Sequence, residues 1–128
     1  MTKKKILIID DETDFCKLVK RNLELISDYE VSIAGDGKKG FKSAKEFKPH
    51  LILLDIMMPG IDGLEVLKKL KGDSETTSSV VIMLTARGDD ELKIKAAQSY
   101  CEDYITKPID APELKIKIEE TLKRNGIK

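Results

Sequence analysis

The stretch LILLDIMMPGIDG, residues 51–63, carries the pattern that decides the fold. Residues 51–54 form a continuous apolar run of strand length, which is typical of a central parallel strand covered on both faces. Asp55 directly follows the run, and the Pro-Gly and Asp-Gly pairs after it are turn signals. The stretch therefore predicts a buried strand that ends on a carboxylate and continues through a loop into a helix.

Four other segments are strand candidates. Residues 5–9 and 80–84 are apolar runs of the same kind. Residues 29–34 and 103–105 are shorter or more polar, which suits the edges of a sheet. The sequence therefore predicts five strands.

Helical patterns lie between these strands. The first helix is expected from about Glu12 to Ile26, and the second ends before Pro49. The third ends near Gly72, the fourth follows residues 80–84, and the fifth begins near Pro112, a residue suited to a first helical turn. Asp11 is a candidate N-cap of the first helix.

Apolar residues three and four positions apart predict the buried faces of these helices. The first helix is expected to bury a stripe that includes Leu18, and the fourth a stripe that begins at Leu92. Ile94 and Ile116 fall outside these stripes, so both are expected to be exposed. The complete predicted stripe of the first helix is Phe15, Leu18, Val19, Asn22, Leu23 and Ile26.

Five alternations of strand and helix indicate an α/β fold with right-handed crossovers, in which helices cover both faces of a parallel sheet. Two strand orders are common for doubly wound sheets. In the flavodoxin-like order 2-1-3-4-5, the first and third strands are neighbours, so their carboxyl ends meet.

Composition limits the class of protein. The chain has 128 residues, 41% hydrophobic and 36% charged, which indicates one folded domain over residues 1–128 with no separate output module. Its 23 basic and 23 acidic residues cancel, so no global field attracts nucleic acid or an anionic membrane. The apolar run near the amino terminus is too short for a signal peptide, and Cys16 and Cys101 form no metal or redox motif, so we expect a cytoplasmic protein with reduced thiols.

Polar residues at the ends of the predicted strands indicate the chemistry. These residues are Asp10, Asp11, Asp55, Thr85 and Lys107. Ligand sites of open α/β sheets lie at the carboxyl ends of the strands, so the five side chains should converge. Three close carboxylates either have raised pKa values or need a cation, and an oxygen-only ligand set favours Mg²⁺. A lysine and a threonine hydroxyl beside them suit the oxygens of a phosphoryl group.

Four sequence blocks carry a family resemblance. The blocks are IIDDE at 8–12, LLDIMMPGIDG at 53–63, LTA at 84–86 and DYITKPI at 103–109. Together they resemble the receiver domain of two-component response regulators over essentially the whole chain. The resemblance implies the 2-1-3-4-5 order and a phosphorylation-dependent switch that is not an enzyme acting on an external substrate.

The resemblance also implies residue roles. Asp55 would take a phosphoryl group from a phosphohistidine. Asp11, Asp55 and the main-chain carbonyl of Met57 would bind Mg²⁺ directly, and Asp10 would bind it through water. Lys107 would pair with the Asp55 carboxylate or with the phosphoryl oxygens.

Further implications concern the switch. Thr85 would move toward the phosphoryl group, and Tyr104 would change rotamer with it. The Lys107-Pro108 peptide would be cis. Tyr100-Cys101 stands where many receivers have Gly-Ala, so the end of the fourth helix must close without a left-handed glycine.

The implied partners are a sensor histidine kinase or phosphotransfer protein and a downstream protein target, without direct binding to nucleic acid or membrane. The chain would be a monomer, or a dimer on phosphorylation, with Mg²⁺ as its cofactor and no organic cofactor.

Three other protein classes fit the sequence less well. A phosphatase of the haloacid-dehalogenase kind would carry its nucleophile in a DxDx(T/V) block after the first strand, where this chain has DDETD. A flavodoxin-like cofactor binder would need an anion-accepting loop at the same place, and the acidic run would repel an anion. An unphosphorylated interaction module on the same fold would not need all five polar residues.

Overall fold

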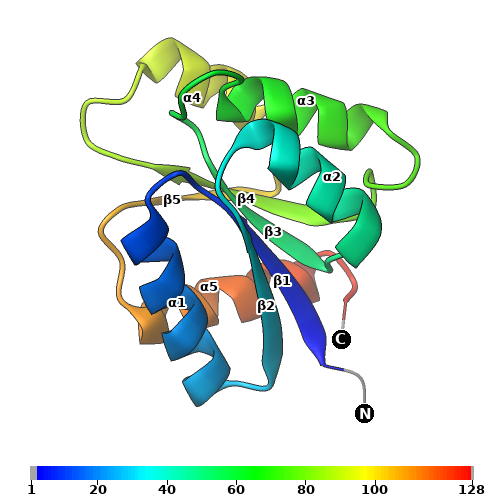
Figure 1. Cartoon of the computed structure of the whole chain (residues 1–128), viewed down its shortest axis with the longest axis vertical. Coiled ribbons are helices and arrows are strands. Elements are labelled where there is room, and N and C mark those ends of the chain that lie inside the picture. Colours follow the sequence, from blue (N-terminus) through cyan, green and yellow to red (C-terminus); the bar gives the residue numbers. More distant parts are fainter. Residues whose placement is uncertain (1–2, 128) are drawn as a thin grey trace.

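Five parallel strands form one sheet in the order β2-β1-β3-β4-β5 in the computed structural model, which describes residues 3–127 (Figure 1). The strands are β1 (Lys4–Ile9), β2 (Tyr29–Ala34), β3 (Leu51–Asp55), β4 (Val80–Thr85) and β5 (Asp103–Thr106). The predicted strands and the flavodoxin-like order are therefore confirmed. Of the predicted domain, residues 1, 2 and 128 lie outside the described part.

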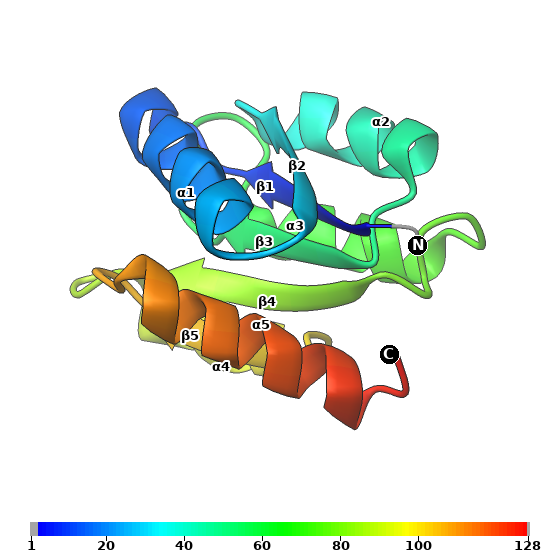
Figure 2. The same ribbon diagram turned by 90° about the horizontal axis from the view of Figure 1, so that it is seen from below.

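Five helices cover both faces of the sheet, as predicted. The helices are α1 (Thr13–Ile26), α2 (Gly37–Phe47), α3 (Gly63–Gly72), α4 (Glu91–Gln98) and α5 (Ala111–Arg124). α1 and α5 lie on one face, and α2, α3 and α4 lie on the other (Figure 2). No helix in residues 3–127 is long and apolar enough to cross a membrane.

Two apolar cores follow from this arrangement, one on each side of the sheet. Successive residues of a strand point to opposite faces, so Leu51 and Leu53 contribute to the core under α1 and α5. Ile52 and Leu54 contribute to the core under α2, α3 and α4. Every residue of β3 is buried, which is why the strand reads as a continuous apolar run.

The buried faces of α1 and α4 differ from the predictions. In α1 the buried residues are Cys16, Val19 and Leu23, and Leu18 is 58% exposed. The predictions for Leu18 and Ile26 were wrong. Leu18 lies about 100° around the helix from the buried Val19, and Ile26, 40% exposed, is the last residue of the helix.

In α4, Ile94 packs against the core three residues before the buried Ala97. Leu92, two residues before Ile94, is therefore on the opposite side of the helix and is 80% exposed. The predictions for Leu92 and Ile94 were both wrong, whereas Ile116 is exposed as expected.

Aspartates cap the other four helices, but α1 begins differently. The capping residues are Asp36, Asp62, Asp90 and Asp110, each of which accepts a backbone N–H of the first turn. The N-cap of α1 is Glu12, whose side chain makes no capping bond. Asp11 precedes the N-cap, so its predicted capping role was wrong. The carboxylate of Asp10 instead accepts the Glu12 N–H at 3.0 Å.

The end of α4 closes without a glycine, as the sequence requires. The C-cap, Ser99, keeps a right-handed conformation. The backbone N–H groups of Tyr100 and Cys101 both donate to the Ala97 carbonyl at 3.0 Å. These two hydrogen bonds satisfy the Ala97 carbonyl at the helix end without a residue in the left-handed conformation.

Candidate functional site

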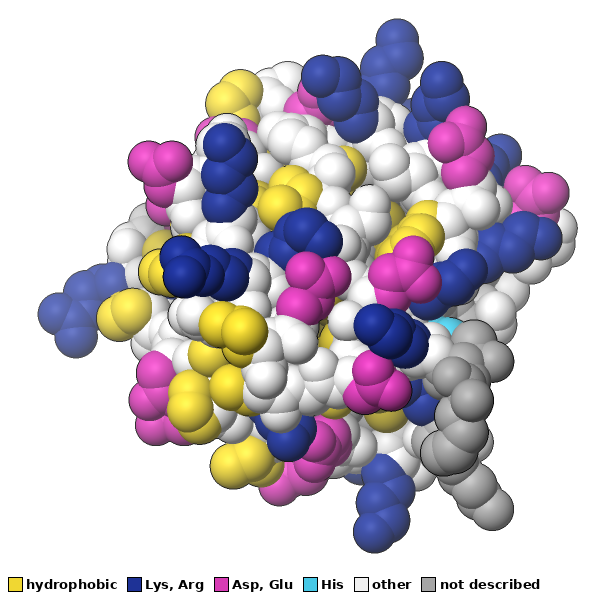
Figure 3. All heavy atoms as spheres, turned by 60° about the horizontal axis from the view of Figure 1, so that its bottom comes forward, with side chains coloured by type: hydrophobic (Ala, Val, Ile, Leu, Met, Phe, Trp, Pro, Cys, Tyr) yellow, Lys and Arg dark blue, Asp and Glu magenta, His cyan; other side chains and the backbone are white. Residues whose placement is uncertain are grey.

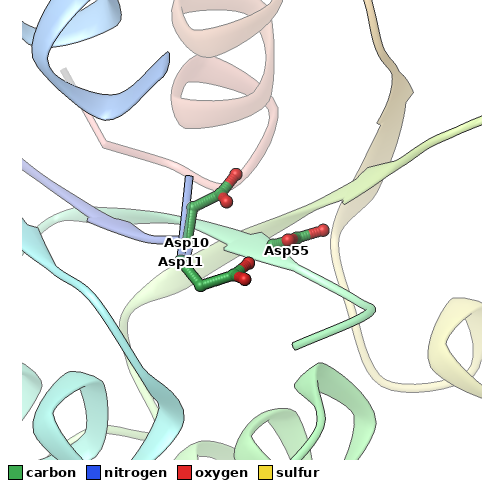
Figure 4. Close-up of side chains that lie close together, drawn as sticks. All are labelled: Asp10, Asp11 and Asp55. Atoms are coloured by element: carbon green, nitrogen blue, oxygen red, sulfur yellow. The ribbon is translucent and has the colours of Figure 1, made fainter. Parts of the chain in front are cut away.

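The candidate site lies at the carboxyl ends of β1 and β3. These strands are hydrogen-bonded neighbours with Ile9 paired to Leu54, so Asp10 and Asp55 extend from adjacent strand ends. Carboxylate oxygens of Asp10, Asp11 and Asp55 lie within 4.8 Å of one another (Figure 4). Asp10 and Asp55 are buried, whereas Asp11 is exposed. The predicted convergence of the three carboxylates is therefore observed.

The loop after Asp55 depends on a glycine. Gly63 begins α3, and its N–H donates to the Ile56 carbonyl at 2.8 Å. A Cβ at position 63 would lie 2.2 Å from the Asp55 carbonyl oxygen, so no larger residue fits without moving the backbone. Gly63 therefore allows α3 to start directly against the backbone of Asp55. Met57 lies within this loop, with a partly exposed side chain.

The surroundings of Asp55 disfavour the ionised form of its carboxyl group. Burial raises the pKa of Asp55 to about 7, and the charges of Asp10 and Asp11 act in the same direction. Lys107 opposes this shift without cancelling it. A bound cation would favour the ionised form of Asp55.

Lys107 reaches the carboxylates from the end of β5. Its backbone N–H donates to the Thr85 carbonyl at 2.6 Å, and the Lys107-Pro108 peptide is cis, as predicted. Its Nζ lies 2.7 Å from Asp10 Oδ2, 3.0 Å from Glu12 Oε1 and 3.9 Å from Asp55 Oδ1. The predicted pairing with Asp55 is present as a long ion pair, and the pairing with phosphoryl oxygens stays a prediction. In this structure, Lys107 hydrogen-bonds to Asp10 and Glu12, while Asp55 is beyond hydrogen-bond distance.

These two hydrogen bonds also set the protonation of Lys107. Burial alone would lower its pKa, but hydrogen bonds to Asp10 and Glu12, together with the charges of Asp55 and Asp10, outweigh burial and raise the pKa above its ordinary value. The side chain therefore remains an ammonium group throughout the physiological pH range. Its charge compensates the buried Asp10 carboxylate first.

Thr85 and Tyr104 lie on the neighbouring strands β4 and β5. Thr85 is buried, and its hydroxyl lies 3.4 Å from both the Ile105 carbonyl and the Thr106 hydroxyl. Tyr104, which pairs with Met83 on β4, is 45% exposed. In this state the Thr85 hydroxyl is thus directed to β5, and the Tyr104 ring faces outward.

Two residues near Lys107 were missed in the sequence. The sequence assigns no contact with Lys107 to Glu12, the start of the first helix, or to Phe15, an apolar residue of that helix. The Lys107 Nζ lies 4.4 Å from the centre of the Phe15 ring. The third acidic residue of IIDDE was the available signal for Glu12, whereas the cation–π contact of Phe15 has no signal in sequence spacing.

The donor set fits a hard divalent cation. Asp10, Asp11 and Asp55 offer only carboxylate oxygens, which suit Mg²⁺ better than a thiophilic metal. The nearby Cys16 thiol donates to the Asp10 carbonyl at 3.4 Å. Burial raises the pKa of Cys16 to about 12, so this thiol remains protonated and is no competing ligand.

Comparison with known proteins identifies a family match over most of the chain. The family model described as the response regulator receiver domain matches residues 6–119. The transcriptional regulator RpaA of Synechocystis is 42% identical over 120 residues, which are 94% of this chain and 49% of RpaA. The regulatory protein PhoP of Bacillus subtilis is 38% identical over 124 residues, which are 97% of this chain and 50% of PhoP. The chain thus spans about half the length of the curated relatives it matches.

Solved structures agree with this match. A CheY-like receiver domain protein from Methanospirillum hungatei superposes with a TM-score of 0.86 at 31% identity, covering 97% of both chains. A receiver domain of a Francisella response regulator has a TM-score of 0.81 at 31% identity, covering 95% of this chain and 98% of its own.

Replacing Asp55 by Asn should stabilise the metal-free protein at neutral pH. The unfolded chain loses the Asp55 proton near the ordinary pKa of 3.8, whereas the folded protein loses it near 7. Stability is therefore lost as the pH rises between these two values. We expect Asp55→Asn to add about 1–4 kcal/mol to the free energy of unfolding at neutral pH in EDTA. The gain should shrink as the pH falls toward 4.

Urea denaturation in EDTA measures this effect, and Asp10→Asn is the matched control. That variant removes a charge from the same cluster but also removes the main partner of Lys107, so it should give no gain. Equal stabilities of wild type and Asp55→Asn at neutral pH would show that crowding of the carboxylates does not cost the fold free energy.

Proposed function

The chain belongs to the response regulator receiver domain family, and on that premise we propose that Asp55 is the residue that accepts the phosphoryl group. Receiver domains are phosphorylation-dependent switches of two-component signalling, and this chain is one of them. The observation that supports Asp55 is its position, buried at the end of β3 among Asp10, Asp11 and Lys107. An Asp55 oxygen attacks the phosphorus of a phosphohistidine, the bond from phosphorus to the imidazole nitrogen breaks, and an aspartyl phosphate remains.

Mg²⁺ is the proposed cofactor, since receiver domains generally bind it at an acidic pocket. Asp11, Asp55 and the main-chain carbonyl of Met57 would hold it directly, and Asp10 would hold it through water. When bound, the ion neutralises charge that develops on the transferred oxygens. Lys107 contributes a second positive charge from the side of β5.

We propose that the same residues promote only the phosphorylation and dephosphorylation of this chain. A phosphodonor supplies the phosphoryl group and water removes it, and the group that is modified is the protein's own Asp55. Once the phosphoryl group is attached, the Thr85 hydroxyl donates a hydrogen bond to one of its oxygens.

The proposed output runs from Thr85 to Tyr104. A new hydrogen bond to the phosphoryl group would draw the Thr85 hydroxyl away from Ile105 and Thr106. The space left beside β4 would admit the ring of Tyr104, which is on the adjacent strand. The surface of α4, β5 and α5 would change as a result. Residues of these three elements include the exposed Lys95, Tyr104 and Ile116, the half-buried Lys117, and Ile94, which packs partly against the core.

We propose a histidine kinase or phosphotransfer protein as the phosphodonor and an unidentified protein as the target, in the cytoplasm. Acidic and basic side chains are interspersed over the face that carries α1 and α5 (Figure 3), which offers no uniformly basic surface to nucleic acid. RpaA is described as a DNA-binding regulator, and that description concerns a protein about twice as long. For residues 1–128 we propose a single receiver domain that is a monomer, or a dimer on phosphorylation.

Acetyl phosphate with Mg²⁺ should label Asp55 without any kinase. A carboxylate neutralised by a metal ion can attack a small phosphodonor directly, and the product is an acyl phosphate that alkali hydrolyses. Borohydride trapping followed by mass spectrometry identifies the residue. EDTA and Asp55→Asn should each abolish the label, whereas Asp62→Asn, a change at the next acid of the loop that keeps an N-cap, should retain it. A label on any other residue would refute the assignment.

Thr85→Ala should separate phosphorylation from its output. Beryllofluoride, a stable mimic of the phosphoryl group, should shift NMR resonances of wild-type α4, β5 and α5. We expect Thr85→Ala to bind beryllofluoride yet lose most of the shifts beyond the site. Thr106→Ala is the matched control, because it removes the hydroxyl on β5 that Thr85 faces and should keep the distal shifts. Wild-type shifts in Thr85→Ala would exclude this route.

A further inference from the structure

The ammonium group of Lys107 is enclosed by the start of α1. Asp10 Oδ2 lies 2.7 Å and Glu12 Oε1 lies 3.0 Å from Nζ. The centre of the Phe15 ring, in the first turn of the helix, lies 4.4 Å from Nζ. These three contacts come from one short segment, residues 10–15, and hold the lysine toward β1.

The same segment is tied together by Asp10. One oxygen of Asp10 accepts the Glu12 backbone N–H at 3.0 Å, and the other accepts from Lys107 at 2.7 Å. The backbone of Glu12 is thus fixed, and its side chain turns back to the lysine. Asp10, Lys107 and Glu12 form a closed set of hydrogen bonds.

Asp55 is outside this set. Its nearest oxygen lies 3.9 Å from Nζ, beyond hydrogen-bond distance, although both side chains are largely buried. The charge of Lys107 is therefore shared between two carboxylates before any phosphoryl group arrives. A phosphoryl group on Asp55 must draw that charge away from at least one of them.

Glu12 is the carboxylate that can release Lys107 at low cost. Its side chain is 62% exposed, so water can solvate the carboxylate as soon as the lysine leaves. Asp10 is fully buried and would be left as an unpaired charge. Exchange of partners should therefore occur at Glu12.

We propose that Glu12 is a positioning residue that restrains Lys107 in the unphosphorylated state and competes with the phosphoryl group for it. This proposal rests on the proposed function of Asp55. Because Glu12 competes for Lys107, its charge lowers the affinity of the site for a phosphoryl group. The population of the phosphorylated state is lowered as a result. Neutralising Glu12 releases Lys107 toward Asp55.

The test compares Glu12→Gln with Asp14→Asn. Glu12→Gln keeps the size of the side chain and removes its charge. Asp14 is an exposed acid of the first turn of α1 for which no ion pair is found among residues 3–127, so Asp14→Asn reports the general effect of losing one negative charge nearby. Two quantities are measured, the dissociation constant of beryllofluoride in Mg²⁺ and the ¹³Cε NMR resonance of Lys107, identified by its loss in Lys107→Gln.

We expect Glu12→Gln to bind beryllofluoride about two- to fivefold more tightly, in line with the strength of exposed ion pairs. The change in affinity caused by Asp14→Asn should be less than half of the change caused by Glu12→Gln. In the free protein, the Lys107 resonance of Glu12→Gln should move toward its position in the wild-type beryllofluoride complex, whereas that of Asp14→Asn should not. A purely structural role of Glu12 would not move the resonance in this direction.

Three results would overturn the proposal. They are unchanged or weaker beryllofluoride binding by Glu12→Gln, an equal gain in both variants, and a Lys107 resonance in the free protein that Glu12→Gln does not move. If wild type binds no beryllofluoride, the proposed function of Asp55 fails. The resonance of the free protein then decides the restraint on Lys107 alone.

Discussion

The ion pair between Asp10 and Lys107 is the interaction on which the site depends. It joins the end of β1 to the end of β5 across 97 residues of sequence, with 2.7 Å between Oδ2 and Nζ. Asp10 and Asp55 extend from neighbouring strands, so the sheet itself forces two carboxylates together. Lys107 compensates one of them, which leaves Asp55 in an environment that disfavours its anion. The negative charge of the site is therefore only partly compensated, and a further positive charge would be favourable.

This uncompensated negative charge connects the stability of the fold with the binding of cations at the site. A buried carboxylate whose pKa is raised costs folding free energy at neutral pH, and a cation or a partner that supplies positive charge recovers it. The cost is confined to the carboxyl edge of the sheet. Two apolar cores on either side of β1, β3 and β4 provide the stability that makes such a site tolerable. At Asp55 the negative charges of the site are therefore not fully compensated, and the proposed metal ion would compensate them.

The sequence predicted most of the fold because apolar runs and strand ends are local signals. Residues 51–54 identified a buried strand, and Brändén's rule placed Asp10 and Asp55 at one edge. Local periodicity left two strand orders open, and the family resemblance selected the one observed. Helical periodicity also gave the wrong exposure for Leu18 and Leu92, because packing against the sheet sets which side of a short helix is buried. The sequence did not predict that Lys107 also pairs with Asp10 and Glu12, because only the distances between side chains rank the three acids around Nζ.

A crystal structure of the protein with Mg²⁺ and beryllofluoride would test the central claim most directly, through the neighbours of Lys107 Nζ. The account predicts that the beryllofluoride group is attached to Asp55, that Nζ hydrogen-bonds to it, and that the contact of Nζ with Glu12, now 3.0 Å, is broken. It would be contradicted if Lys107 kept both Asp10 and Glu12 and made no contact with the beryllofluoride, because the charge of Lys107 would then not be what the phosphoryl group recruits.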